Sequence, residues 1–198
     1  MGLTITKQEL AELEKVNFEG EIYIIDHPAE VDNAVAYLST KSALGFDTET
    51  KPAFKRGQVN NVALLQLATE DECFLFRLNK IGYPESLEKL LCNESVKKIG
   101  LSLRDDFAAL RKRTGKKPQN FIDLQLFVDK FGIEDNSLQK IYAIIFGKKI
   151  SKSQRLSNWE AAELTPAQQS YAAIDAWACL KIYNYLTQSK KNNNSKKQ

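Results

Sequence analysis

The stretch Leu44-Gly45-Phe46-Asp47-Thr48-Glu49-Thr50 combines an apolar approach with two carboxylates that are two positions apart. Side chains alternate along a β-strand, so Asp47 and Glu49 are expected to project from the same face. Two acids on one face repel each other unless a cation lies between them, and their oxygen atoms suit magnesium or manganese. Taken alone, the pair is more typical of a strand that ends in a solvated acidic loop. The rest of the chain is needed to distinguish such a loop from a metal site.

The charge distribution separates the chain into a body and a tail. The 198 residues carry a net charge of +3, and four lysines without any acid lie in residues 189–198, so the body alone carries −1. Residues 1–188 have the length of one domain, and the Asn- and Lys-rich tail is expected to be disordered. A body so close to neutral predicts that any contact with phosphate is local or depends on bound metal ions.

Several classes of protein are disfavoured by composition. No apolar run reaches the roughly 20 residues of a membrane span, and the N-terminus lacks the pattern of a signal peptide. The cysteines at positions 73, 92 and 179 are odd in number and far apart, which indicates reduced thiols and a cytoplasmic protein. The single histidine, His27, leaves little scope for a serine hydrolase or a multi-histidine zinc site. Catalysis is therefore expected to depend on carboxylates and metal ions.

The apolar patterns predict a mixed sheet with helices packed on it. Strands are expected at 22–25, 43–49, 62–68, 73–76 and 97–100, with a further short strand or turn at 121–123. Helices are expected at 4–16, 28–38, 84–92, from about 104, and then at 124–131, 137–146 and 165–187. Strands that alternate with helices and are followed by a helical half are typical of this α/β arrangement.

A third acid lies inside an apolar helical stripe. At 100° per residue, Asp175 falls on the same side of its predicted helix as Ile174, Ala178 and Ile182. An unpaired carboxylate in such a place is costly, so Asp175 is expected to face a cation, an arginine or a loop that it caps. Tyr171 lies one turn earlier and would place its hydroxyl beside that carboxylate.

A fourth acid comes from the segment Gly100–Leu110, which contains two adjacent aspartates. Asp106 borders the apolar face of the predicted helix, whereas Asp105 points about a quarter-turn further round, toward solvent. Asp106 is therefore the acid that we expect to face the interior, and Asp105 suits a helix cap or the first turn.

Three acidic segments in this order resemble the DEDD superfamily of 3′–5′ exonucleases. Its tyrosine variety is indicated by Tyr171-x-x-x-Asp175, since the histidine of the other variety would stand at the position of Ser170. The chain is most similar to the Werner-type exonuclease domain, which is related to ribonuclease D. This likeness covers about residues 20–187 and includes Arg56-Gly57, Val62–Leu67, Val96–Gly100, Leu156–Trp159 and Leu164-Thr165.

The resemblance implies a fold, a reaction and a set of ligands. The fold would be a ribonuclease-H-like α/β core with a five-stranded mixed sheet flanked by helices. Two divalent cations, Mg²⁺ or Mn²⁺, would bind there, the first to Asp47, Glu49 and Asp175 and the second to Asp47 and Asp106, while Tyr171 orients the attacking water. The enzyme would remove nucleoside 5′-monophosphates from a nucleic acid with a free 3′ end, DNA being favoured, without a nucleotide cofactor.

The basic residues near the predicted site are candidates for binding phosphate away from the cut, although solvated side chains are the alternative. One group that could bind phosphate follows the strand of Asp47 and Glu49 and consists of Lys51, Lys55 and Arg56. The other lies in a loop before Trp159 and consists of Lys149 and Arg155, together with Lys148 and Lys152. Other functions compatible with the sequence are trimming of RNA 3′ ends, a catalytically silent nucleic-acid-binding module, and hydrolysis of mononucleotides. The oligomeric state stays open.

Overall fold

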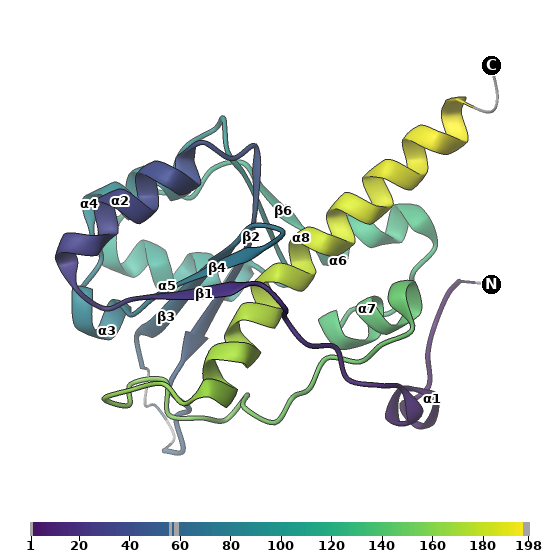
Figure 1. Cartoon of the computed structure of the whole chain (residues 1–198), viewed down its shortest axis with the longest axis horizontal. Coiled ribbons are helices and arrows are strands. Elements are labelled where there is room, and N and C mark those ends of the chain that lie inside the picture. The colour runs from purple at the N-terminus through teal and green to yellow at the C-terminus, as the bar shows by residue number, and fades with distance from the viewer. Residues whose placement is uncertain (1, 56, 58–59, 196–198) are drawn as a thin grey trace.

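A six-stranded mixed sheet forms the centre of the protein in the computed structural model, which describes residues 2–55, 57 and 60–195 (Figure 1). The strands lie in the order β1-β4-β3-β2-β5-β6. The neighbours β2–β3 and β3–β4 are antiparallel, and the other three pairs are parallel. Their bounds are β1 Glu21–Ile25, β2 Ala43–Thr50, β3 Val62–Ala68, β4 Glu72–Phe76, β5 Lys97–Gly100 and β6 Phe121–Asp123.

The sheet has one strand more than the five that the family resemblance implied, and this sixth strand lies where the sequence predicted a short strand or turn at 121–123. The extra strand, β6, has three residues and pairs in parallel with β5, so that Phe121 lies opposite Lys98 and Asp123 opposite Gly100. Three residues are too few to show the alternation that marks a strand in sequence, and the pairing depends on a segment about 20 positions earlier.

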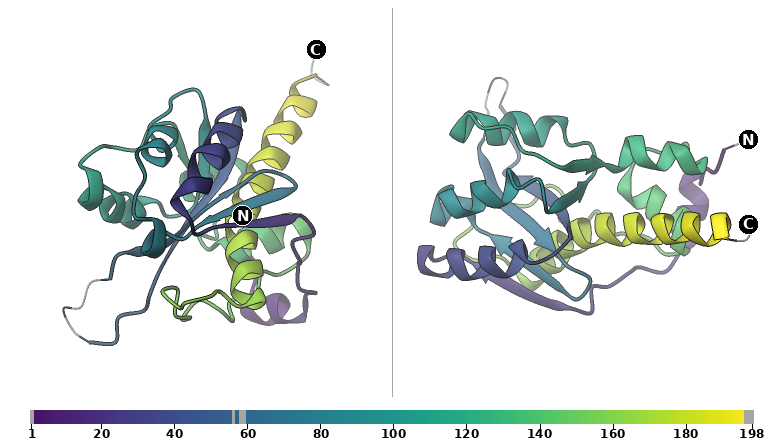
Figure 2. Two further views of the ribbon diagram at one scale, coloured as in Figure 1. Left: turned by 60° about the vertical axis from the view of Figure 1, so that its left-hand side comes forward. Right: turned by 90° about the horizontal axis from the view of Figure 1, so that it is seen from above.

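Helices cover both faces of the sheet (Figures 1 and 2). The helix α8 crosses one face, and α2, α4 and α5 lie on the other. A 3₁₀-helix at Asp129–Phe131 follows α6, so the predicted helix at 124–131 is divided between two types. The helix bounds are α1 Lys7–Glu12, α2 Pro28–Ser39, α3 Leu78–Ile81, α4 Glu85–Leu91, α5 Arg104–Thr114, α6 Leu124–Val128, α7 Leu138–Phe146 and α8 Pro166–Ser195.

The strand β3 is buried along its whole length because both of its faces are covered. Leu65 and Leu67 belong to the core beneath α2 and α4. Leu64 and Ala68 point to the other face and pack with Ala172 of α8. This two-sided burial explains why the sequence of β3 is almost uniformly apolar.

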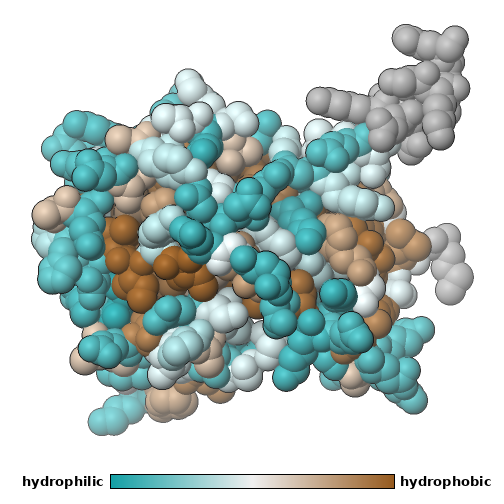
Figure 3. Space-filling view, viewed as in Figure 1, coloured by the Kyte–Doolittle hydropathy of each residue, from teal (hydrophilic) through white to brown (hydrophobic). Residues whose placement is uncertain are grey.

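The helix α8 is longer than predicted. It was expected to end at residue 187 and to be followed by a disordered tail, but it continues to Ser195. The added residues include no glycine or proline, and lysine is a good helix former, so the helix meets no stop signal there. Among the residues that the structure describes, no helix is long and apolar enough to cross a membrane. The face in Figure 3 is mainly hydrophilic, with separate hydrophobic areas between the polar side chains.

Candidate active site

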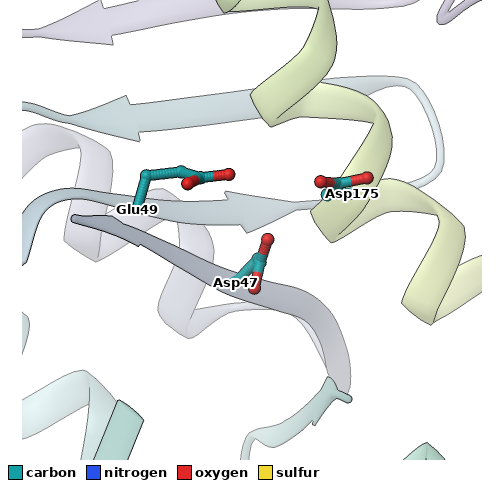
Figure 4. Close-up of side chains that lie close together, drawn as sticks. All are labelled: Asp47, Glu49 and Asp175. Atoms are coloured by element: carbon teal, nitrogen blue, oxygen red, sulfur yellow. The ribbon is translucent and has the colours of Figure 1, made fainter. Parts of the chain in front are cut away.

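Three acids from two distant segments meet at the centre of the sheet (Figure 4). Asp47 and Glu49 project from β2 toward α8, as the alternation predicted, and Asp175 comes from α8. One carboxylate oxygen from each residue can be chosen so that all three lie within 4.8 Å of one another. This spacing lets one cation contact all three acids.

The close approach of α8 to β2 depends on small residues. A Cβ atom at Gly45 would overlap the carbonyl oxygen of Ala176, so a larger residue could not keep this packing. Ala172, Ala173 and Ala176 are fully buried against the same face of the sheet. Glycine and alanine thereby bring the backbone of α8 near enough for Asp175 to reach the acids of β2.

Burial and mutual repulsion make these acids weak. Burial is the largest cause of the raised pKa of Asp47, followed by the charges of Asp175 and Glu49. Burial, with the charges of Asp175 and Asp106, raises the pKa of Glu49 to about 8. Burial likewise raises the pKa of Asp175 to about 7, although Tyr171 and Lys152 oppose the shift. A cluster that resists ionisation by itself, and consists only of oxygen ligands, fits a divalent cation well.

Tyr171 adjoins the acidic cluster from one turn earlier on α8. It is hydrogen-bonded to Asp175, as the helical spacing predicted. Burial and then the charges of Asp175 and Glu49 raise the pKa of Tyr171 above its ordinary value. The phenol therefore stays protonated at neutral pH and can donate or accept a hydrogen bond, but it is a poor base.

Asp106 lies beside the cluster without joining the group of three. Its carboxylate accepts a hydrogen bond from the Thr48 hydroxyl, which projects from the opposite face of β2, where α5 packs. The charge of Asp106 nevertheless contributes to the raised pKa values of Asp47 and Glu49. Asp105 is exposed, so the prediction that Asp106 is the inward-facing acid of the pair is confirmed.

The predicted phosphate-binding residues have different surroundings. Lys51 forms an ion pair of 3.3 Å with Glu160, while Lys55 and Arg155 are exposed and Arg56 lies outside the described residues. Lys149 was expected to face the substrate, but its Nζ donates to the carbonyl oxygen of Ala11.

The N-terminal segment explains this difference. Residues 15 and 149 form a β-bridge, and backbone hydrogen bonds of 2.9 and 2.8 Å join Val16 and Glu14 to Lys149. The predicted helix at 4–16 therefore ends earlier, at Glu12, and the chain that follows it is extended at Leu13. Lys149 therefore stabilises this N-terminal packing.

A cavity of about 340 Å³ adjoins the acids, and it is lined in part by residues that the sequence did not single out as part of the site. Lys152, in the Ser151-Lys152-Ser153 loop, lines it together with Asp47, Tyr171 and Asp175. Lys152 also favours ionisation of Asp175 through its charge. Sequence reasoning included Lys152 in a basic loop but could not tell it from its neighbours. Further polar residues line the cavity: Ser102, Gln125, Asn136, Ser137 and Gln139.

Asp123 organises the backbone near this cavity and was also missed. Its carboxylate accepts hydrogen bonds of 3.0 Å from the backbone N–H groups of Ser102, Leu103 and Gln125. It thus caps α6 and fixes the loop that leads into α5, the helix of Asp106. An aspartate directly before a helical segment is a known capping signal, and it could have been recognised in the sequence.

Comparison with known proteins identifies the family. A family model described as a 3′–5′ exonuclease matches residues 22–190. The bifunctional 3′–5′ exonuclease/ATP-dependent helicase WRN of Mus musculus is 36% identical over 155 residues, which cover 75% of this chain and 11% of that protein. Exonuclease 3′–5′ domain-containing protein 2 of Drosophila melanogaster is 34% identical over 154 residues, covering 76% of this chain and 26% of that protein.

The fold is also similar to that of a solved exonuclease structure. The crystal structure of Escherichia coli RNase D, described as an exoribonuclease involved in structured RNA processing, superposes with a TM-score of 0.76 at 23% identity, covering 87% of this chain and 46% of that one. The chain spans 11% and 26% of the two curated relatives. The resemblance found in the sequence is thus confirmed, and the chain belongs to the 3′–5′ exonuclease family.

Proposed function

We propose that this protein is a metal-dependent 3′–5′ exonuclease that releases nucleoside 5′-monophosphates from a nucleic acid with a free 3′ end. The convergence of the Asp47, Glu49 and Asp175 carboxylates within 4.8 Å is the observation on which the proposal rests. Two Mg²⁺ or Mn²⁺ ions are the cations proposed for the site. When bound, such ions would lower the pKa of the attacking water and stabilise the charge on the leaving 3′-oxygen.

The two ions are proposed to have different sets of acidic ligands. Asp47, Glu49 and Asp175 are the proposed ligands of the first, and Asp47 and Asp106 those of the second. Asp106 is half-buried, and its charge already affects Asp47 and Glu49, which supports this assignment. In the reaction, water attacks the phosphorus of the last phosphodiester at the 3′ end and loses a proton, the bond from that phosphorus to the 3′-oxygen of the shortened chain breaks, that oxygen takes up a proton, and the last nucleoside leaves as its 5′-monophosphate.

Tyr171 is proposed to orient the attacking water through its hydroxyl. Its raised pKa excludes a phenolate at neutral pH, so the role is one of positioning rather than proton removal. Its contact with Asp175 supports this role, because the hydroxyl is thereby held beside a proposed metal ligand. We expect Tyr171→Phe to lower the cleavage rate by about 100-fold, the order of loss that follows from a misplaced reactant.

DNA is the substrate that we favour, and RNA is the alternative. The higher identity is to an exonuclease/helicase, whereas the likeness to the exoribonuclease RNase D, at 23% identity, is one of fold. Exposed Lys55 and Arg155, and Lys51 beside Glu160, are proposed to contact phosphates away from the cut. Cys73, Cys92 and Cys179 are free thiols, which supports the proposal that the protein is cytoplasmic.

One digestion experiment tests the activity and the substrate together. Single-stranded DNA, a recessed duplex and RNA, all labelled at the 5′ end, are incubated with the protein in Mg²⁺, Mn²⁺ or EDTA. We expect a ladder that shortens stepwise from the 3′ end and is absent in EDTA. Cleavage that persists in EDTA would contradict the metal-dependent mechanism, and degradation of mononucleotides alone would indicate a different hydrolase.

An Asp47→Ala variant separates catalysis from binding. We expect it to retain binding to a labelled oligonucleotide while its cleavage falls below detection, because Asp47 is the ligand shared by both proposed ions. A wild-type protein that binds but never cuts would instead support a silent binding module. Asp105→Ala is the matched control, since this exposed acid is outside the cluster and its loss should leave the cleavage rate unchanged.

A further inference from the structure

Gln66 is a buried polar residue that folding alone does not explain. It lies in β3, whose other six residues are apolar and which is buried throughout. Its exposed fraction is 0%. Neither its Oε1 nor its Nε2 atom has a hydrogen-bond partner within the described parts of the chain. An unpaired buried amide destabilises the folded state, so a residue of similar volume without polar atoms would suit the core better.

The register of the sheet places Gln66 beside the acidic cluster. It is the direct partner of Asp47 in the antiparallel pairing of β2 and β3. Residues so paired project from the same face, with Cβ atoms about 4.5–5.5 Å apart. The amide group is therefore within reach of the Asp47 carboxylate, while both remain under α8.

The immediate neighbours of Gln66 along β3 and on the covering helix are apolar. Along β3 the flanking side chains are Leu64 and Ala68, which are paired with Glu49 and Gly45. The covering helix contributes Ala172 and Ala176 to the same apolar cluster. Asp47, directly opposite on the adjoining strand, is the polar group that the strand pairing places beside the amide.

We propose that Gln66 is a positioning residue for Asp47, and that its Nε2 donates a hydrogen bond to the Asp47 carboxylate when a divalent cation is bound. The inference rests on the proposed function, because it assigns a purpose to Gln66 only at a metal site. A carboxylate that binds a cation keeps a free lone pair, and a donor fixed behind it sets its orientation. The amide is neutral, so it adds a donor beside Asp47 without competing with the cation for the carboxylate, as a lysine ammonium would.

The test compares metal binding with stability in the absence of metal. Mn²⁺ is titrated into wild type and Gln66→Leu by calorimetry, and thermal unfolding is followed in EDTA. We expect Gln66→Leu to bind Mn²⁺ about 10- to 100-fold more weakly, the usual loss when a residue behind a metal ligand is removed. Its Tm in EDTA should equal or exceed that of wild type, because the unpaired amide is gone.

Two further variants complete the test. Leu64→Met changes a buried residue on the same face of the same strand, and it should leave Mn²⁺ affinity within about twofold of wild type. Gln66→Met preserves an unbranched side chain and replaces Gln66→Leu if the latter fails to fold. A glutamine with a merely structural role would show the opposite pattern, a lower Tm in EDTA with unchanged Mn²⁺ affinity, and that result would overturn the proposal.

The same titration distinguishes this proposal from the proposed function. A wild-type protein that binds no Mn²⁺ and does not cut nucleic acid would contradict both. A wild type that binds Mn²⁺ and cuts, while Gln66→Leu binds Mn²⁺ equally well, would overturn the role of Gln66 alone.

Discussion

The ionisation of Asp175 and Glu49 connects the acidic cluster to the stability of the protein. Burial raises the pKa of Asp175 to about 7 and that of Glu49 to about 8, so the folded state holds protons that the unfolded chain releases near pH 4. The stabilisation by these protonated acids is complete below about pH 4 and is lost as the pH rises through 7 to 8. A bound divalent cation replaces the protons and reverses this dependence.

We therefore predict that the protein in EDTA loses stability between about pH 4 and pH 8, on the order of a few kcal/mol. Thermal unfolding measured at intervals across this pH range, with and without Mn²⁺, shows whether stability falls or rises with pH. Asp175→Asn should be more stable than wild type in EDTA at pH 8 and should gain less from Mn²⁺. Asp105→Asn, an exposed acid, is the control. A Tm in EDTA that rises from pH 5 to pH 8 would contradict the prediction.

Much of the site at the residue scale could be predicted from the sequence. Strand alternation put Asp47 and Glu49 on one face, and helical periodicity showed Asp175 inside an apolar stripe. The contact of Lys149 with Ala11 could not be predicted, because it depends on the path of a segment more than 130 positions away. Periodicity also gives no sign that Gln66 lies opposite Asp47, since that register belongs to the pairing of two strands.

The packing of β2 against α8 determines the geometry of the site at the scale of elements. Gly45 has no room for a Cβ atom, because the Ala176 carbonyl occupies that space. By the alternation of strand side chains, position 45 lies on the same face as Asp47 and Glu49, and the backbone of α8 fills the space beside it. Close contact of strand and helix is thus a condition for joining Asp175 to Asp47.

We predict that Gly45→Ala forces α8 away from β2, lowers the free energy of unfolding by about 1–3 kcal/mol, as overpacking does, and weakens Mn²⁺ binding at least 10-fold. Chemical denaturation and calorimetry provide the two measurements. Gly82→Ala is the control, since Gly82 has a φ of 72° and open space around its Cβ position, so only backbone strain is added. Equal losses of Mn²⁺ affinity in the two variants would contradict the account.

The residues at which helices and strands begin and end were predicted less well than the presence of these helices and strands. The strands expected at 62–68 and 73–76 are observed as the antiparallel pair β3 and β4, and the helix expected from Pro28 is observed as α2. The sequence predicts the end of α8 eight residues too early, because charged and amide residues indicate disorder, although no helix breaker is present before Ser195. β6 exists through its pairing with β5 and has almost no pattern of its own.

Two segments near the acids are joined to the rest of the molecule by polar contacts. Lys51, after β2, is paired with Glu160, which lies in the loop before α8. The same loop accepts a hydrogen bond at the Ala161 carbonyl from Arg77, a buried residue just beyond β4. This loop includes Arg155 and Lys152. Its contacts with Lys51 and Arg77 would therefore help to position these two basic residues for binding the substrate.

We predict that Arg77→Leu loosens this loop, because a charge-assisted hydrogen bond worth about 1.5–3 kcal/mol is removed. Hydrogen exchange should accelerate in residues 157–163, and the KM for an oligonucleotide should rise more than kcat falls. Arg111→Leu, at an exposed position of α5, is the matched control. Unchanged exchange in this loop would show that Arg77 does not anchor it.

The arrangement of the whole molecule was predicted as a class but not in detail. Alternating strands and helices indicated a mixed α/β sheet, which is observed. The order β1-β4-β3-β2-β5-β6 could not be derived, because strand pairing is set by contacts between distant segments rather than by local patterns. The family resemblance supplied the fold where local reasoning ended.

Anomalous diffraction from crystals grown with Mn²⁺ tests the central claim most directly, because it locates the cation without assuming an activity. We predict a strong peak bounded by the carboxylates of Asp47, Glu49 and Asp175, at about 2.1 Å from their nearest oxygen atoms. The peak should be missing in Asp175→Asn crystals grown in the same way. A wild-type crystal whose Mn²⁺ binds elsewhere, with these three carboxylates free of metal, would contradict the account.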